Sequence, residues 1–304
     1  MTKKKKRLIF YIAVIALPIL QFVIFYLYVN FNSIVMSFQR FVAPKDGEVG
    51  LQTVFAGFDN YKTAFATLFG SSYMIGNSLK MIACELFIGL PLALIFSFYI
   101  YKKFFLAKLF KVMLFMPQII SSIIFVMLFK YIVNEVYISV FHAENGLLSA
   151  TAPESTKMAT ILFYNIWISF GINVMMFTGS MSSIDESTVE AAQLDGVNYM
   201  QEFVYITIPL IWSTFSTFVV ISLTGIFTHQ LSLFAFFSDG ANKLSSFGYF
   251  LYISSLKNVL EEKPAMRELT YSQLSALGII LTAITLPIVL ETRKIMSKIG
   301  PSAE

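Results

Sequence analysis

The sequence reads STVEAAQLDG from Ser187 to Gly196 and, after nine intervening residues, ITIP from Ile206 to Pro209. Ser187 and Glu190 have the S-x-x-E spacing of a capping box, and the two alanines after Glu190 favour a helix. Gly196 suits the left-handed residue that ends a helix, and Pro209 can bend the chain where the next segment begins. This stretch predicts a short, well-delimited helix that leads into a longer one.

Apolar residues dominate the chain on both sides of this helix. Of 304 residues, 57% are hydrophobic and 13% are charged, and the mean hydropathy is +0.71. Most apolar runs are close to the ~20 residues with which a helix crosses a bilayer. Six runs stand out, at about Leu8–Val29, Tyr73–Tyr101, Val112–Phe129, Met158–Met181, Phe203–Phe227 and Ser272–Leu290. The predicted fold class is therefore all-α, a polytopic membrane protein with six transmembrane helices.

The first run follows the basic segment Lys3–Arg7, as the apolar part of a signal peptide would. It exceeds the usual ~7–15 apolar residues and no clear cleavage site follows it, so we expect an uncleaved helix. No internal repeat and no stretch long enough for an independent soluble core is evident. We expect a single membrane domain over residues 1–304.

Basic residues predict the orientation, because Lys and Arg resist translocation. They gather at the N-terminus, in the short loop after the second run and in the tail, as Lys3, Lys4, Lys5, Lys6, Arg7, Lys102, Lys103, Lys108, Lys111, Arg293, Lys294 and Lys298. These regions, and hence both termini, should be cytoplasmic, whereas the loops at about residues 30–72, 130–157 and 228–271 should face outward. The net charge of +4 is then explained by lipid headgroups rather than by nucleic acid.

The loop between the fourth and fifth runs, at about residues 182–202, must be cytoplasmic in this arrangement, yet it is acidic. It contains no Lys or Arg, and it carries Asp185, Glu186, Glu190, Asp195 and Glu202. Its charges therefore reflect something other than topology.

The spacing of Glu-Ala-Ala, three residues, Gly, nine residues and Ile-x-aliphatic-Pro resembles the signature loop of binding-protein-dependent ABC importer permeases, with Ile208 where the family usually has Leu. Phe55–Tyr61 resembles the family's outward Phe-x-Gly-x-x-Asn-Tyr segment, and Asn77–Ser78 resembles the Asn-Thr that opens its second helix. The chain also resembles the carbohydrate-uptake branch of the family, close to the maltose and glycerol-phosphate permeases, at Pro117, Trp167, Gly171 and Gln193–Gly196. The tail lacks the Gly-rich ending common in the second permease of such pairs, so the chain resembles the first of two.

This resemblance implies a type I ABC importer permease fold in the cytoplasmic membrane of a bacterium. It also implies that the loop at about 182–202, the coupling loop, docks on a separate dimeric ABC ATPase through Glu190, Ala191, Ala192, Asp195 and Gly196. Glu190 could cap the helix, contact basic groups of the ATPase, or do both. The other expected partners are a second homologous permease subunit, an extracellular solute-binding lipoprotein and membrane lipid.

Nucleotide binding is expected on the partner rather than on this chain. The sequence contains no Gly-x-x-x-x-Gly-Lys-Ser/Thr loop to hold phosphates. ATP and Mg should therefore be bound by the ATPase, and we expect this chain to bind no cofactor and to be no enzyme itself. No catalytic or metal-binding residue is predicted, since the runs contain no nucleophile paired with His, no Asp pair and no metal-ligand cluster.

Polar residues within the runs suggest a path for a sugar or oligosaccharide. Asn165, Ser169 and Asn173 are spaced i, i+4 and i+8, so they share one helix face that should point into the bundle. Trp167 lies about 200° from Asn165 on a helix of ~100° per residue, so it belongs to a packing face. The other candidates for the path are Ser222 and Thr224.

Glu85 lies inside the second run and leaves an alternative function open. A carboxylate within the membrane can serve proton coupling in an ion-coupled secondary transporter, or it can be a structural residue held by hydrogen bonds or by a lysine. The single cysteine, Cys84, has no partner for a disulfide within the chain. Neither residue names the sugar.

Overall fold

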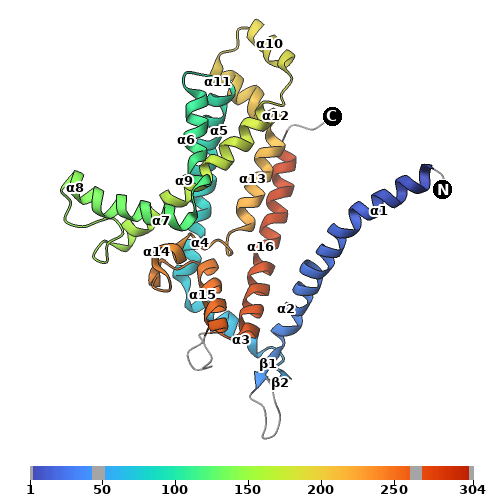
Figure 1. Cartoon of the computed structure of the whole chain (residues 1–304), viewed down its shortest axis with the longest axis vertical. Helices are drawn as coiled ribbons and strands as arrows, with labels where there is room; N and C mark the ends of the chain where they lie inside the picture. The colour runs from blue at the N-terminus through green and yellow to red at the C-terminus, as the bar shows by residue number, and fades with distance from the viewer. Residues whose placement is uncertain (1–2, 43–51, 261–268, 301–304) are drawn as a thin grey trace. The chain divides into compact units, whose positions relative to one another are not determined.

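A computed structural model describes residues 3–42, 52–260 and 269–300 (Figure 1). The chain divides into two compact units, one formed by residues 1–70 and 254–282 and the other by residues 71–253 and 283–304. Both units are mainly helical, as the sequence predicts. Parts of two predicted outward loops, residues 43–51 and 261–268, lie outside the described residues.

The described residues contain five helical stretches that are long and apolar enough to cross a membrane, or six if one bent pair is counted as a single span. The five are Lys3–Ser37, Ser72–Tyr101, Ser122–Phe141, Glu154–Met181 and Tyr271–Ile299, and the pair is Tyr199–Leu210 with Trp212–Thr224. Helices satisfy their own backbone hydrogen bonds, which hydrocarbon cannot do for them. The prediction of six helical spans is thereby confirmed, with a small β-hairpin added to the all-α class.

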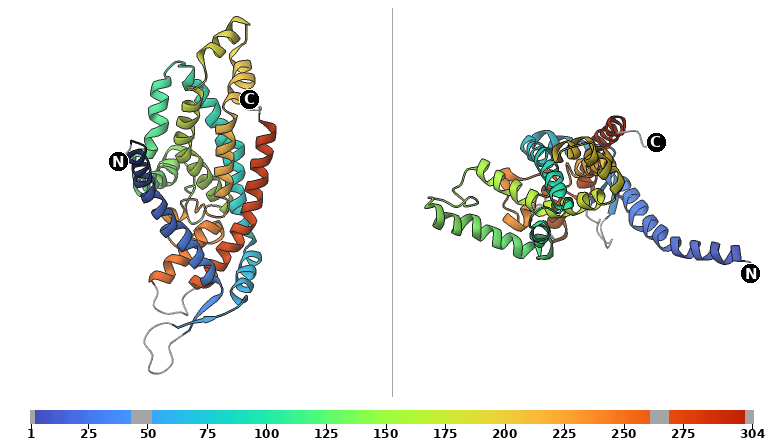
Figure 2. Two further views of the ribbon diagram at one scale, coloured as in Figure 1. Left: turned by 90° about the vertical axis from the view of Figure 1, so that its right-hand side faces the viewer. Right: turned by 90° about the horizontal axis from the view of Figure 1, so that it is seen from above.

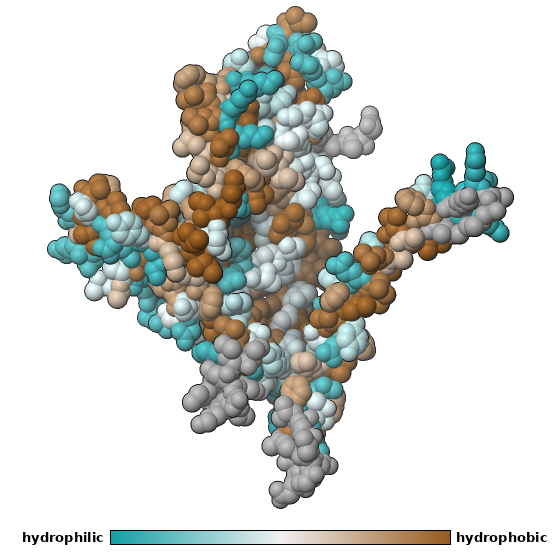
Figure 3. Space-filling view, in the orientation of Figure 1, coloured by the Kyte–Doolittle hydropathy of each residue, from teal (hydrophilic) through white to brown (hydrophobic). Residues whose placement is uncertain are grey.

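In the first unit one continuous helix forms the first span. It consists of α1 (Lys3–Phe22), the π-helical η1 (Val23–Tyr28) and α2 (Val29–Ser37). Its described side chains are almost all exposed, and Figure 3 shows hydrophobic residues along α1. Exposed apolar side chains over such a length suit contact with lipid.

A two-stranded antiparallel hairpin follows, and a polar anchor ties it to α2. The elements are β1 (Gln39–Val42), β2 (Gln52–Phe55) and α3 (Asp59–Gly70). The buried Asn60 amide donates to the Ser37 and Gln39 carbonyl oxygens, at 2.8 Å each. The Tyr61 hydroxyl lies 2.7 Å from Ser37 Oγ. The Phe55–Tyr61 segment that resembles the family therefore has a structural role at this turn.

In the second unit the second and fourth spans form the centre. The second span runs through α4 (Ser72–Cys84), η2 (Glu85–Gly89) and α5 (Leu90–Tyr101), and the fourth is α9 (Glu154–Met181). α5 and α9 lie side by side (Figure 2). Ser97 Oγ on α5 donates to the Val174 carbonyl on α9 at 3.0 Å. The buried cluster between them includes Leu90, Phe98, Phe177 and Met181.

A polar anchor on α4 holds the segments that follow the fifth run. These segments are α14 (Leu233–Phe237), η5 (Asn242–Leu244) and α15 (Phe247–Leu260), and α16 (Tyr271–Ile299) is the last helix. The Asn77 amide on α4 donates to the Lys243 and Ser245 carbonyl oxygens, at 2.9 and 3.0 Å. Ser78 Oγ accepts from the Phe247 backbone at 3.3 Å. Asn77 and Ser78 thus fix the approach to α15.

The third predicted run, Val112–Phe129, is not one straight helix. The chain forms α6 (Ala107–Ile119), breaks, and continues as α7 (Ser122–Tyr131), η3 (Ile132–Val136) and α8 (Tyr137–Phe141) in another direction (Figure 1). Ile120 is extended, with ψ 140°. Pro117 removes one backbone hydrogen bond from the last turn of α6, and serine is a weak helix former at the restart. The candidate span lies further along the chain, and the predicted outward loop starts later than residue 130.

Gly171 marks the close crossing of α6 and α9. A Cβ atom on Gly171 would lie 2.2 Å from the Leu114 carbonyl oxygen, whereas one on Gly179 of the same helix would meet nothing within 4 Å. We therefore expect Gly171→Ala to lower the free energy of unfolding by about 1–3 kcal/mol through overpacking. Gly179→Ala should leave it within about 0.5 kcal/mol of wild type. Thermal unfolding in detergent checks this, and equal midpoints for the two variants would contradict the close crossing.

Candidate functional site

The helix of the coupling loop, α10 (Glu186–Leu194), begins two residues earlier than the predicted Ser187 cap indicates. Asp185 is its N-cap, and the carboxylate accepts from the Ser187 backbone N–H at 3.1 Å. Ser187 is already inside the first turn, so the predicted capping box of Ser187 and Glu190 is wrong. Aspartate caps at least as well as serine and adds a negative charge at the positive end of the helix dipole. Of the roles considered for Glu190, capping is thereby removed.

The end of α10 is the left-handed turn that the sequence predicts. Gly196 has φ +78°, and its N–H donates to the Gln193 carbonyl at 3.1 Å. The Val197 N–H donates to the Ala192 carbonyl, also at 3.1 Å. These two bonds form a Schellman motif, which satisfies carbonyls that a helix end otherwise leaves unpaired.

A capping box does exist, but it lies after Gly196, at the start of the next helix. Asn198 Oδ1 accepts from the Gln201 N–H at 2.9 Å, and Gln201 Oε1 accepts from the Asn198 N–H at 3.0 Å. It starts α11 (Tyr199–Gln201), which continues as η4 (Glu202–Thr207) and α12 (Ile208–Leu210). The N-x-x-Q spacing is the sequence signal that was missed.

The bend predicted at Pro209 is confirmed. α12 and α13 (Trp212–Thr224) meet at 71°, with the break at Ile211. Ile211 is buried in the cluster of α5 and α9 side chains. Trp212 Nε1 donates to the Met296 carbonyl at 2.8 Å, which holds the start of α13 to the end of α16. The angle between the coupling loop and the fifth span is therefore held by packing as well as by proline.

Most of the predicted coupling residues lie on the open surface of α10. Exposed members are Glu190, Ala191, Asp195 and Gly196, whereas Ala192 is buried. Leu194 is 90% exposed and was not among the residues predicted from the sequence. Figure 1 shows α10 beyond the ends of α5 and α6, in the same unit. Small and apolar exposed residues on a capped helix suit docking to a protein groove, which stays a prediction here.

One acid of the coupling loop has a partner in the basic loop after the second span. Glu202 Oε1 forms an ion pair with Lys102 Nζ, and their side chains are 2% and 11% exposed. Glu202 is thus a buried counter-ion rather than a surface acid. The pair also brings together two loops that charge distribution assigns to the same side of the membrane.

The polar face of α9 points into the bundle as predicted. The buried Asn165 amide donates to the Ile161 and Leu231 carbonyls, at 2.8 and 3.0 Å, and Asn165 Oδ1 accepts from Ser232 Oγ at 3.2 Å. Trp167 lies on the packing face, as expected, with its ring 5.2 Å from that of Phe125. Asn165 therefore joins α9 to the segment before α14.

Asn173 and Ser169 meet Glu85 of the second span. Asn173 Nδ2 donates to Glu85 Oε1 at 3.0 Å, and Ser169 Oγ lies 3.5 Å from Glu85 Oε2. Glu85 is buried and lies one helical turn from Gly89, where an added Cβ would lie 2.9 Å from Oε2. The hydrogen-bonded interpretation of Glu85 is confirmed.

Ser222 and Thr224 do not join this cluster. They lie at the end of α13, where Thr224 Oγ1 donates to the Ile221 carbonyl at 2.6 Å. Within the described residues no hydrogen bond links either side chain to α9, and no group of three His, Cys, Asp or Glu could hold a metal ion. The role of all five polar residues in a solute path stays a prediction.

The contact between Glu85 and Asn173 predicts non-additive mutations. Glu85→Leu and Asn173→Leu should each destabilise the protein, because each leaves the other polar group buried without its partner. The double variant should be more stable than the sum of the two changes by about 0.5–3 kcal/mol. Unfolding midpoints of the single and double variants measure this. Thr224→Ala serves as the control, and a Glu85–Asn173 pair as additive as Glu85 with Thr224 would contradict the contact.

Known proteins share both the sequence pattern and the fold of this chain. Residues 88–297 match the family described as "Binding-protein-dependent transport system inner membrane component". The arabinooligosaccharides transport system permease protein AraP of Bacillus subtilis (strain 168) is 28% identical over 290 residues, covering 91% of this chain and 85% of AraP.

Two solved structures of bacterial alginate ABC transporters are also similar. One, a transporter involved in the import of the acidic polysaccharide alginate, is 21% identical with a TM-score of 0.75, covering 98% of this chain and 99% of that chain. The other, in complex with an alginate pentasaccharide-bound periplasmic protein, is 20% identical with a TM-score of 0.72, covering 97% and 96%. These likenesses establish the type I permease fold. Because the family match spans more than half of the 304 residues, this chain belongs to the inner membrane components of binding-protein-dependent transport systems.

Proposed function

We propose that this chain is a membrane-spanning permease subunit of an ATP-driven importer that carries a sugar or oligosaccharide delivered by an extracellular binding protein. The observation that carries the proposal is the coupling loop. Its helix is capped by Asp185, ended by Gly196 and exposed at Leu194, in a chain whose other long helices are apolar. A short exposed helix of this kind is only marginally stable by itself, and it suits docking into a groove of a partner protein.

The partner at α10 is a separate dimeric ATPase. This chain has no phosphate-binding loop of its own, so ATP and Mg bind to that partner. Glu190 lies exposed on α10 and free of any capping role, which leaves contact with basic groups of the ATPase as its function. Ala191 and Gly196 are exposed and small enough to allow close approach, whereas the buried Ala192 packs within this chain.

The orientation places the coupling loop and both termini in the cytoplasm. Lys and Arg gather at the N-terminus, after the second span and in the tail. The Lys102–Glu202 pair supports this arrangement, because it joins a basic loop to the acidic coupling loop. A second permease subunit would complete the pore, and a solute-binding lipoprotein would deliver the solute on the outer side.

The solute is a sugar or glycan. Support comes from AraP, named for arabinooligosaccharides, and from the alginate transporters, both of which share the fold or the family pattern. Ser169 and Asn173 on α9, with Ser222 and Thr224 on α13, are the proposed lining of such a path, whereas Asn165 of the same polar face is bonded within the chain. An ion-coupled transporter is not retained, because the chain belongs to a binding-protein-dependent family and Glu85 is held by Asn173.

Changes at two positions of the docking surface test this function. Gly196→Val forces a branched residue into a left-handed conformation, at a cost of roughly 1–2 kcal/mol, and Glu190→Lys reverses an exposed charge. We expect each to abolish uptake while the protein stays inserted in the membrane, and Ser183→Ala, in the same loop, to behave as wild type. The measurements are ATPase co-purification and uptake of a panel of labelled arabino-, malto- and alginate oligosaccharides by proteoliposomes. Wild-type uptake by both variants would remove the coupling role.

A further inference from the structure

The Lys102–Glu202 pair lies inside an aromatic enclosure. Lys102 Nζ is 5.5 Å from the ring centre of Tyr101, 5.8 Å from that of Phe98 and 6.0 Å from that of Tyr199. These distances are within the range in which an aromatic face attracts a cation. The lysine is therefore held by rings from both sides of the contact as well as by the carboxylate.

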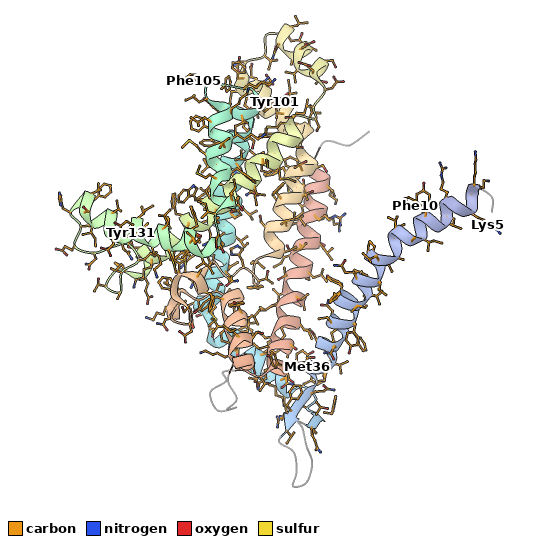
Figure 4. All side chains as sticks on the ribbon, in the orientation of Figure 1. Lys5, Phe10, Met36, Tyr101, Phe105 and Tyr131 are labelled. Carbon is orange, nitrogen blue, oxygen red and sulfur yellow. The ribbon has the colours of Figure 1, made fainter. Side chains whose placement is uncertain are left out.

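The same rings join the two loops to each other. The Phe98 and Phe203 rings have centres 4.9 Å apart, and the Phe104 and Tyr199 rings meet edge to face at 5.2 Å. One member of each pair belongs to the end of α5 or the turn after it, and the other to α11 or η4. Figure 4 shows Tyr101 at the end of α5 and Phe105 in the turn that follows it. The ion pair is the polar centre of an otherwise apolar contact.

Stability alone does not account for a charged pair in this position. The free energy needed to remove two ions from water can exceed the free energy gained from their attraction. Proteins in which apolar residues of similar volume replace a buried ion pair are therefore often as stable. A buried ion pair instead fixes the relative position of the two segments that carry it, because displacement of either ion in a low-dielectric site is unfavourable. The pair thus fixes the register between the two loops.

Its place in the chain gives this register a consequence for coupling. Glu202 is the first buried residue after Ala192, and its N–H donates to the Asn198 carbonyl at 2.8 Å in the capped turn. Lys102 directly follows α5, which is bonded to α9 through Ser97. A force on α10 can therefore reach the second and fourth spans through Lys102, in addition to the fifth span through the backbone.

We propose that Lys102 and Glu202 are positioning residues that make the coupling loop move as one body with the second span. The inference deepens the proposed function, on which it rests, by naming the link between the docking helix and the bundle. Neither residue touches the solute. Without the pair, α10 can still dock, but its movement is no longer transmitted to α5.

Pulsed electron paramagnetic resonance tests the link in the assembled complex, purified through a tag on this chain. Cys84→Ser removes the one native cysteine, and spin labels are placed on the exposed residues Gln193 of α10 and Ile95 of α5. Each sample is measured without nucleotide and with ATP and vanadate. With Lys102 and Glu202 intact, the distance between the two spin labels should show one narrow distribution in both states, because the two loops move together.

The variants separate positioning from folding. Lys102→Met with Glu202→Met removes the charges at similar volume, and we expect near wild-type thermal stability but loss of the narrow distance. Exchange of the charges, Lys102→Glu with Glu202→Lys, should restore it. Uptake per ATP hydrolysed, for the panel oligosaccharide that the wild-type complex imports, should fall about fivefold or more in the double-Met variant, within the usual range of coupling between sites. Lys108→Met, on an exposed neighbouring lysine, is the matched control.

A narrow distance in the double-Met variant overturns the proposal, whatever the uptake. If that variant does not fold, the charge exchange decides, and a broad distance there overturns the proposal as well. The distance measurement requires no transported solute. If the wild-type complex imports no member of the panel, the proposed function fails while the result on the link still stands.

Discussion

A polar group inside a bilayer must find its partner within the protein, and this constraint organises the chain. Backbone groups are satisfied by long helices, and several polar side chains of the spans bind one another or a carbonyl of another segment. Asn173 donates to Glu85, Asn165 to the Leu231 carbonyl and Ser97 to the Val174 carbonyl. Each bond joins elements far apart in sequence, so the requirement that makes polar residues costly also fixes how the spans of the second unit meet.

The coupling loop obeys the opposite requirement. Its helix is short and largely exposed, and isolated helices of this length are only marginally stable in water. Asp185 at one end and the Schellman motif at Gly196 at the other provide hydrogen-bond partners for backbone N–H and C=O groups that the helix ends leave unpaired. Beyond Gly196 the chain returns to an apolar contact at Glu202. A rigid helix on a rigid base is the physical basis for a docking element that transmits force.

Local features of this architecture could be predicted from the sequence, and features that depend on distant contacts could not. Run lengths predicted all the spans except the third, and Gly196 and Pro209 predicted the helix end and the bend, since these depend on neighbouring residues. The capping box was assigned to Ser187 because the pattern cannot tell that Asp185 competes for the same helix end. The break after α6 was missed because Pro117 is compatible with a continuous apolar run. Lys102 and Glu202 are 100 positions apart, beyond any periodicity.

α10 is the proposed surface through which this chain meets an ATPase, and photo-cross-linking measures that contact most directly. Leu194 is 90% exposed on α10, and Phe55 is 77% exposed on β2, in the other unit and on a loop predicted to face outward. A photoreactive amino acid in place of Leu194, in the assembled transporter, should give a covalent adduct with the ATPase subunit, and the same amino acid in place of Phe55 should not. An ATPase adduct from position 55, with none from position 194, would contradict the account.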